Sequence, residues 1–206
     1  MSLELWLAFA IASAALLAVP GPTVMLVVSY ALGRGKTSGW ATVPGVTLGD
    51  FIAMTASLIG VGAILAASST MFSIVKFAGA AYLIWLGIKL WRSDASPAAL
   101  AQPSSGGSAW SMFWNACIVT ALNPKSIIFF VAFVPQFVDP AKPLLTQLVI
   151  LEATFLSLAA INVAIWAVLA GELRARFSSP STLRFVNRVG ASFLVGAGLM
   201  TAMLRR

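Results

Sequence analysis

Long apolar runs separated by short polar segments dominate the chain. Six of these runs meet or approach the ~20 mainly apolar residues that a membrane-spanning helix needs. They cover residues 3–32, 39–67, 72–90, 109–138, 143–171 and 183–204. The first run has no basic segment before it and is too long for a signal peptide, so we interpret it as a retained helix. Arg184 and Arg188 lie in the first turns of the last run, and we expect them to snorkel to the membrane interface. The pattern predicts an all-α integral membrane protein with six transmembrane helices.

Composition supports lipid as the main solvent. Hydrophobic residues make up 60% of the 206 residues and charged residues only 9%, whereas soluble domains carry roughly 25% charged residues. The net charge of +7 does not indicate nucleic acid, because the basic residues lie at the ends of apolar runs, where the membrane surface attracts them. The single Cys117 and the absence of histidine give no metal-ligand spacing. We therefore expect no metal and no cofactor, and any proton relay must use carboxylates or lysine.

The two halves of the chain resemble each other. A Ser-, Pro- and Gly-rich linker, residues 93–108, separates residues 1–92 from residues 109–206. Three predicted helices in each half force the halves into opposite orientations, which is the inverted-repeat arrangement of many secondary transporters. We interpret residues 1–206 as one transmembrane transporter domain. A shift of 102 residues superposes Pro22 on Pro124 and Asp50 on Glu152, and a shift of 111 superposes Gly79 on Gly190 and Gly87 on Gly198.

Lysine and arginine positions predict the orientation. The first, third and fifth connections carry Arg34, Lys36, Lys89, Arg92, Arg174, Arg176, Arg184 and Arg188, and the opposite side carries Lys76, Lys142, Arg205 and Arg206. The side richer in basic residues is the cytoplasmic side. Both termini are therefore predicted to be periplasmic, in a multi-pass protein of a bacterial inner membrane.

Proline interrupts two of the predicted helices. Pro20 and Pro22 each remove a backbone donor and disfavour helical geometry at the preceding residue, so the first helix is predicted to be broken there. Asn123 and Pro124 form a favourable helix start inside the fourth run, so that helix is predicted to be broken as well. For either position alone a simple proline kink is the better interpretation. Two breaks at matched positions favour a functional interpretation.

Three ionisable residues lie at membrane depth. Asp50 and Glu152 are near the middle of their runs, and an ionisable residue there costs at least ~2.5–3.5 kcal/mol. The structural alternative is an ion pair between Asp50 and Lys125 that only locks helices together. This pair leaves one acid over, and a spare carboxylate predicts a proton or cation site. For Asn162 a hydrogen bond between helices is favoured over a substrate contact, and the Gly-rich stretch 45–49 predicts close helix packing.

These stretches resemble the LysE/RhtB family of bacterial exporters of lysine, homoserine and threonine. The resemblance rests on "PGP" at residues 20–22, "GRGKTSGWATVPGVTLGD" at residues 33–50 and "NPKSIIFFVAFVPQF" at residues 123–137, and covers the chain in order and length. It implies a six-helix inner-membrane efflux carrier driven by proton exchange. The candidate substrate or proton site residues are Gly21, Pro22, Thr23, Asp50, Asn123, Pro124, Lys125 and Glu152, the last from the repeat argument alone.

An exported amino acid is a zwitterion, so its site needs both signs of charge. The helix starts after Pro22 and Pro124 offer partial positive charge to a carboxylate, and Asp50 or Glu152 can hold the ammonium. Lys125 either binds the substrate carboxylate or neutralises Asp50.

The function expected from the resemblance is export of homoserine, threonine, homoserine lactone or a similar neutral or basic amino acid by proton antiport. The expected partners are this small molecule, protons and lipid, and no nucleic acid. Export of another small solute or cation, a channel, and a structural membrane protein are the alternatives. An enzyme is not expected, because the sequence has no Ser–His, His–Glu or Cys–His set. The sequence leaves open whether the protein works as a monomer or as a homodimer.

Overall fold

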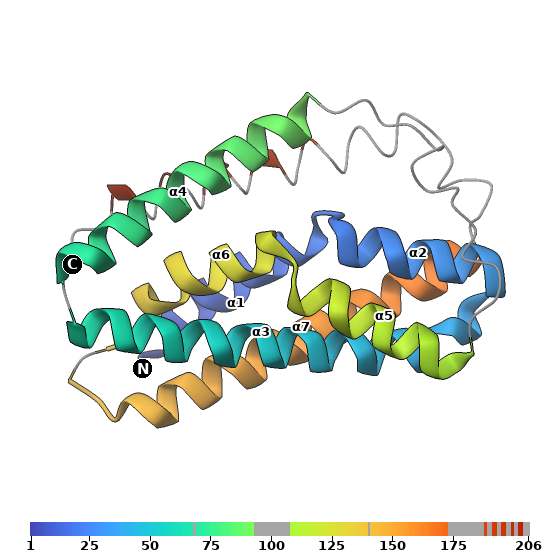
Figure 1. Ribbon diagram of the computed structural model, residues 1–206, viewed down its shortest axis with the longest axis horizontal. Helices are drawn as coiled ribbons and strands as arrows, with labels where there is room; N and C mark the ends of the chain where they lie inside the picture. The colour runs from blue at the N-terminus through green and yellow to red at the C-terminus, as the bar shows by residue number, and fades with distance from the viewer. Residues whose placement is uncertain are drawn as a thin grey trace.

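The described part of the chain is all-helical. A computed structural model describes residues 1–67, 69–92, 108–139 and 141–172, together with isolated positions from 188 to 203. Within these ranges there is no strand, and the α-helices lie side by side along one long axis (Figure 1). The elements are α1 (Leu3–Ala18), α2 (Pro22–Arg34), η1 (Lys36–Ser38), α3 (Gly39–Ala67), α4 (Ser69–Trp91), α5 (Ala109–Ala121), α6 (Pro124–Ala132), η3 (Val134–Phe137) and α7 (Leu144–Glu172).

Several helices have the length and composition of membrane spans. Within the described residues, the stretches Lys36–Gly60 and Leu144–Ala170 each qualify alone, and α1–α2 and α5–α6 raise the number to four if each bent pair is one span. The predicted third run coincides with α4. Residues 93–107 of the linker and most of the predicted sixth run fall outside the described residues. The structure thus confirms a helical protein with membrane-spanning candidates, and the six-span inverted repeat stays a prediction.

Both predicted helix breaks are present. Helix α1 ends at Ala18 and α2 begins at Pro22, and the two axes differ by 53°. Helix α5 ends at Ala121 and α6 begins at Pro124, with a bend of 45°. Each new helix begins with proline, whose fixed φ suits the first helical position and whose missing N–H is not needed there. The local chemistry that predicted the breaks is therefore sufficient to produce them.

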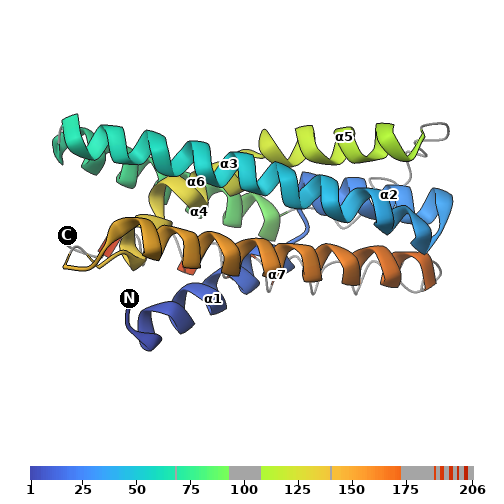
Figure 2. The ribbon, with the colours of Figure 1, turned by 90° about the horizontal axis from the view of Figure 1, so that it is seen from below.

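The core around α6 and η3 differs from the core around α2. Around α6 and η3, large aromatic side chains pack together, with ring centroids 5.4 Å apart for Phe9 and Phe137 and 4.8 Å apart for Phe130 and Phe155. Around α2, by contrast, the core consists of small residues such as Val27 and Ala116. Figure 2 shows α1 leaning away from the bundle, so that α7 lies between α1 and α3. The aromatic cluster is what joins α1 to η3.

Glycines allow α3 and α5 to approach closely, as the Gly-rich stretch 45–49 predicts. A Cβ atom on Gly49 would lie 2.5 Å from the carbonyl oxygen of Cys117, and one on Gly45 would overlap the carbonyl of Phe113. Contacts this short do not occur between real atoms, so any side chain at these positions would push the helices apart. Helix α3 is thereby fixed against α5.

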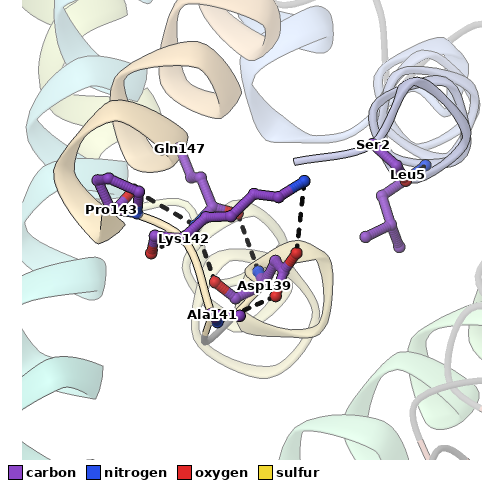
Figure 3. A network of polar contacts seen from close by, with 7 residues as sticks. All are labelled: Ser2, Leu5, Asp139, Ala141, Lys142, Pro143 and Gln147. Carbon is purple, nitrogen blue, oxygen red and sulfur yellow. Dashed lines mark hydrogen bonds and ion pairs between the residues drawn. The ribbon is translucent and has the colours of Figure 1, made fainter.

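A polar loop joins η3 to α7 (Figure 3). The side chain of Gln147 accepts a hydrogen bond from the backbone N–H of Asp139 and donates to the carbonyl of Asp139, both at 2.9 Å. Asp139 forms an ion pair with Lys142 at 3.6 Å. The backbone N–H of Ala141 donates to the Asp139 carboxylate and, more than the nearby ammonium groups, holds the pKa of that carboxyl below its ordinary value. These contacts fix the start of α7.

Candidate functional site

A small polar cavity lies where the two helix breaks meet. Its volume of about 20 Å³ is room for one or two water molecules. Among the predicted site residues, Pro22 and Pro124 are exposed first residues of α2 and α6 and do not line it, and neither does Glu152. The walls come from α1, α2, α3, α6 and α7: Leu16, Leu17, Gly21, Thr23, Val24, Val46, Asp50, Asn123, Lys125, Ser126, Asn162 and Val163. Sequence positions that are far apart thus form one site.

Lys125 is held by backbone carbonyls. Its Nζ donates to the carbonyl oxygens of Leu16 at 3.0 Å and Val19 at 2.8 Å, at the C-terminal end of α1. The last carbonyls of a helix lack intrahelical partners and carry partial negative charge, so a buried ammonium is stabilised there. In the described ranges, the only ion pair within 4.0 Å is Asp139–Lys142. Asp50 and Lys125 therefore share the cavity without forming a direct salt bridge.

Asp50 lines the cavity as a buried acid without a hydrogen-bonding partner. It lies in α3 with 3% of its surface exposed. Its carboxylate accepts no hydrogen bond from any residue that the structure describes, although a carboxylate can accept about four. A buried carboxylate that accepts no hydrogen bond is expensive, and the charge of the Lys125 ammonium offsets only part of this cost. Such a carboxyl group is stabilised by a bound proton or by a nearby cation. The cavity has room only for a proton or a very small cation.

The two helix starts at the cavity are different. The side-chain oxygen of Asn123 accepts a hydrogen bond from the N–H of Lys125 at 3.1 Å, so α6 is capped. Gly21 precedes α2 and offers no side-chain cap. The uncapped start of α2 borders the cavity beside Lys125, since a Cβ on Gly21 would lie 3.4 Å from Nζ. This end of the cavity is suited to an anionic group.

Two hydroxyl groups and an amide join the breaks to each other. The hydroxyl of Thr23 accepts hydrogen bonds from Thr120 and from the amide of Asn123, both at 3.2 Å. Thr23 belongs to α2, whereas Thr120 and Asn123 flank the start of α6. The two broken helices are therefore tied together beside the cavity. Thr23 and Asn123 are candidate site residues from the sequence, but the hydrogen bond between them was not predicted.

Asn162 makes the interhelical contact that the sequence favoured. Its amide nitrogen donates to the carbonyl oxygen of Leu17 at 3.0 Å, which joins α7 to α1. It also lines the cavity, a role that sequence analysis did not predict. The sequence feature that could have indicated this role is an asparagine within an apolar run.

Glu152 lies apart from the cavity. The hydroxyl of Thr55 donates to its carboxylate at 2.6 Å, between α3 and α7. Thr55 follows Asp50 by five residues, which is about 7.5 Å along a helix. The two acids that the repeat argument matched thus have different surroundings, and only Asp50 borders the cavity.

Fold and site together define a class: a helical membrane protein that encloses a polar cavity between two broken helices. The family model of LysE type translocators matches residues 14–204. The chain belongs to this family of translocators, which confirms the resemblance drawn from the sequence motifs.

Relatives cover the whole chain. A "Homoserine/homoserine lactone efflux protein" of Salmonella typhi is 33% identical over 100% of this chain and 99% of its own length. An "Uncharacterized membrane protein" of Vibrio cholerae is 31% identical over 98% of both chains. A "Leucine efflux protein" of Enterobacter sp. is 36% identical over 59% of this chain and 57% of its own. No solved structure matches the chain.

Proposed function

We propose that the protein is a secondary transporter that exports amino acids or amino-acid derivatives from the cytoplasm by proton antiport. The observation that carries this proposal is Asp50, a buried carboxylate that borders a polar cavity and accepts no hydrogen bond from the described residues. The family and the names of its relatives support export. Homoserine, threonine, homoserine lactone and similar neutral or basic amino acids are the substrates to test first, and leucine is added because of a relative's name.

The site provides both charges that an amino acid needs. In our proposal the substrate ammonium binds Asp50, and its carboxylate binds the uncapped start of α2 beside the Lys125 ammonium. After the substrate leaves on the outer side, Asp50 takes up a proton, because the buried carboxylate accepts no hydrogen bond in the described part of the chain. The protonated carrier then returns to the cytoplasmic side.

The orientation completes the proposal. Both termini are placed in the periplasm of a bacterial inner membrane, on the basis of the lysine and arginine positions. The two halves, residues 1–92 and 109–206, are proposed to form an inverted repeat around the cavity. The proline breaks at the start of α2 and α6, which occupy matched positions, support this arrangement.

An efflux screen tests the function. Cells that overproduce the protein are loaded with labelled amino acids, and release is compared with that of cells producing Asp50→Asn. We expect faster release of at least one neutral or basic amino acid with the wild-type protein only. We also expect release to slow when the external pH is raised, because the inward proton gradient falls. Release of no tested compound would refute amino-acid export, and release independent of the proton gradient would refute antiport.

A further inference from the structure

Within the described residues, helix α1 packs against few of the other elements that wall the cavity. It packs mainly on α7 and on η3, whereas α3 packs on α5, α6 and α7. Gly45 and Gly49 fix α3 against α5 with no space for a side chain. Helix α1 also ends at a break that contains two prolines and a glycine, which leaves few backbone hydrogen bonds to hold it in line with α2. Figure 2 shows its N-terminal part leaning away from the other helices.

The cavity cannot accept an amino acid as it stands. A volume of about 20 Å³ is smaller than any amino acid and suits one or two waters. One wall must therefore move before a substrate can enter. Leu16 and Leu17 at the end of α1 form part of that wall.

Two side chains from the second half of the chain hold this end of α1. Lys125 on α6 donates to the carbonyls of Leu16 and Val19, and Asn162 on α7 donates to the carbonyl of Leu17. All three bonds go to carbonyl groups in the last turn and C-cap of the helix, where the regular intrahelical bonds end, although the Leu16 carbonyl also accepts from the Val19 N–H at 3.2 Å. They are therefore the polar contacts at the cavity end of α1 that must break if α1 swings outward, and the 3.0 Å bond from the Trp6 indole to the Thr154 hydroxyl must break nearer its N-terminus.

We propose that α1 is the gate of the cavity and that Lys125 and Asn162 form the latch that holds it shut. Lys125 uses two of its three N–H groups on the latch and lies beside the start of α2, where an anionic group would bind. An anion arriving there competes with the Leu16 and Val19 carbonyls for the ammonium and so loosens the latch. Asn162 is a positioning residue, since it acts through α1. The need for this movement and its link to export rest on the proposed function, whereas the contacts of the latch do not.

Thiol labelling tests the gate without any transported substrate. Cys117 is the only cysteine, so a Cys117→Ala background removes it, and Ser126→Cys places a nearly isosteric reporter in the cavity wall. Labelling by N-ethylmaleimide, which crosses membranes, is followed by mass spectrometry in vesicles. The latch variant is Asn162→Leu. The matched control is Asn115→Leu, which removes a 2.8 Å hydrogen bond to Tyr30 between α5 and α2 but does not touch α1.

We expect Asn162→Leu to raise the labelling rate about threefold to tenfold, because the loss of one interhelical hydrogen bond raises the population of the open state by about this factor. Asn115→Leu should leave the rate unchanged. Equal rates in the latch variant and the background, at equal membrane content, would refute the gate, and so would equal increases in both asparagine variants. If the leucine variant fails to accumulate, Asn162→Ala tests the same bond by the same criteria. If no compound is exported in the efflux screen, the proposed function fails and this labelling test still stands.

Discussion

Replacing Lys125 by methionine removes two hydrogen bonds that the ammonium donates to the carbonyls of Leu16 and Val19. Hydrogen bonds of charged groups are worth about 1.5–3 kcal/mol each, but interhelical bonds in membranes average nearer ~0.6 kcal/mol. We therefore expect Lys125→Met to lower the free energy of unfolding by about 1–6 kcal/mol. Asp50→Asn keeps the shape of the side chain and removes a buried charge that accepts no hydrogen bond, so we expect stable protein that no longer exports.

The double variant separates these roles from a static ion pair. If Asp50 and Lys125 act separately, their effects on the unfolding free energy should add to within about 0.5 kcal/mol. A locking ion pair predicts a loss of about 3–5 kcal/mol for each single variant and recovery in the double variant. The assay is thermal unfolding of the purified proteins, with membrane abundance and efflux rate measured beside it. A double variant that is more stable than either single variant and exports at the full rate would refute our reasoning.

Three further perturbations test other parts of the structure. Gly49→Ala should lower the free energy of unfolding by about 1–3 kcal/mol, because its Cβ would lie 2.5 Å from the Cys117 carbonyl oxygen. Thermal unfolding measures this loss, and Gly33→Ala is the control because a Cβ there would have no neighbour within 4 Å. Glu152→Gln should abolish export or uncouple it from the proton gradient, and an unchanged rate at every external pH would remove Glu152 from the proposed site. A reporter that is active only in the cytoplasm should be silent when fused after Arg206, and a strong signal would reverse the predicted orientation.

Local backbone chemistry made part of this structure predictable. Pro22 and Pro124 mark helix starts because proline lacks the N–H that a helix interior needs, and Asn123 adds a cap. The structure has α2 and α6 beginning at these prolines. Gly45 and Gly49 predicted close packing for a similar reason, since only glycine lets two backbones touch. Such features depend on a few neighbouring residues, so a sequence reveals them.

The partners of the charged residues were not predictable in this way. The sequence shows one lysine and two acids at membrane depth, and an ion pair between Asp50 and Lys125 is one alternative that it suggests. Lys125 instead uses backbone carbonyls, which every residue carries and which no sequence pattern marks. Asp50 and Glu152 both lie near the middle of their apolar runs, but Glu152 contacts Thr55, which is about 7.5 Å along α3 from Asp50. Glu152 meets Thr55 between α3 and α7, whereas Asp50 borders the cavity.

The hydrogen bonds from Lys125 to backbone carbonyls have a consequence for how transport responds to the membrane potential. If the Lys125 ammonium, which donates to two backbone carbonyls, keeps its charge in both ionisation states of Asp50, the charge of the site changes during the cycle. The two residues together then carry no net charge with Asp50 ionised and one positive charge with Asp50 protonated. A unit charge that crosses the whole membrane field does work of about 2.3 kcal/mol per 100 mV. An inside-negative potential would therefore draw the empty, protonated site inward and leave the ionised site unaffected, so that voltage would drive the return half of the cycle.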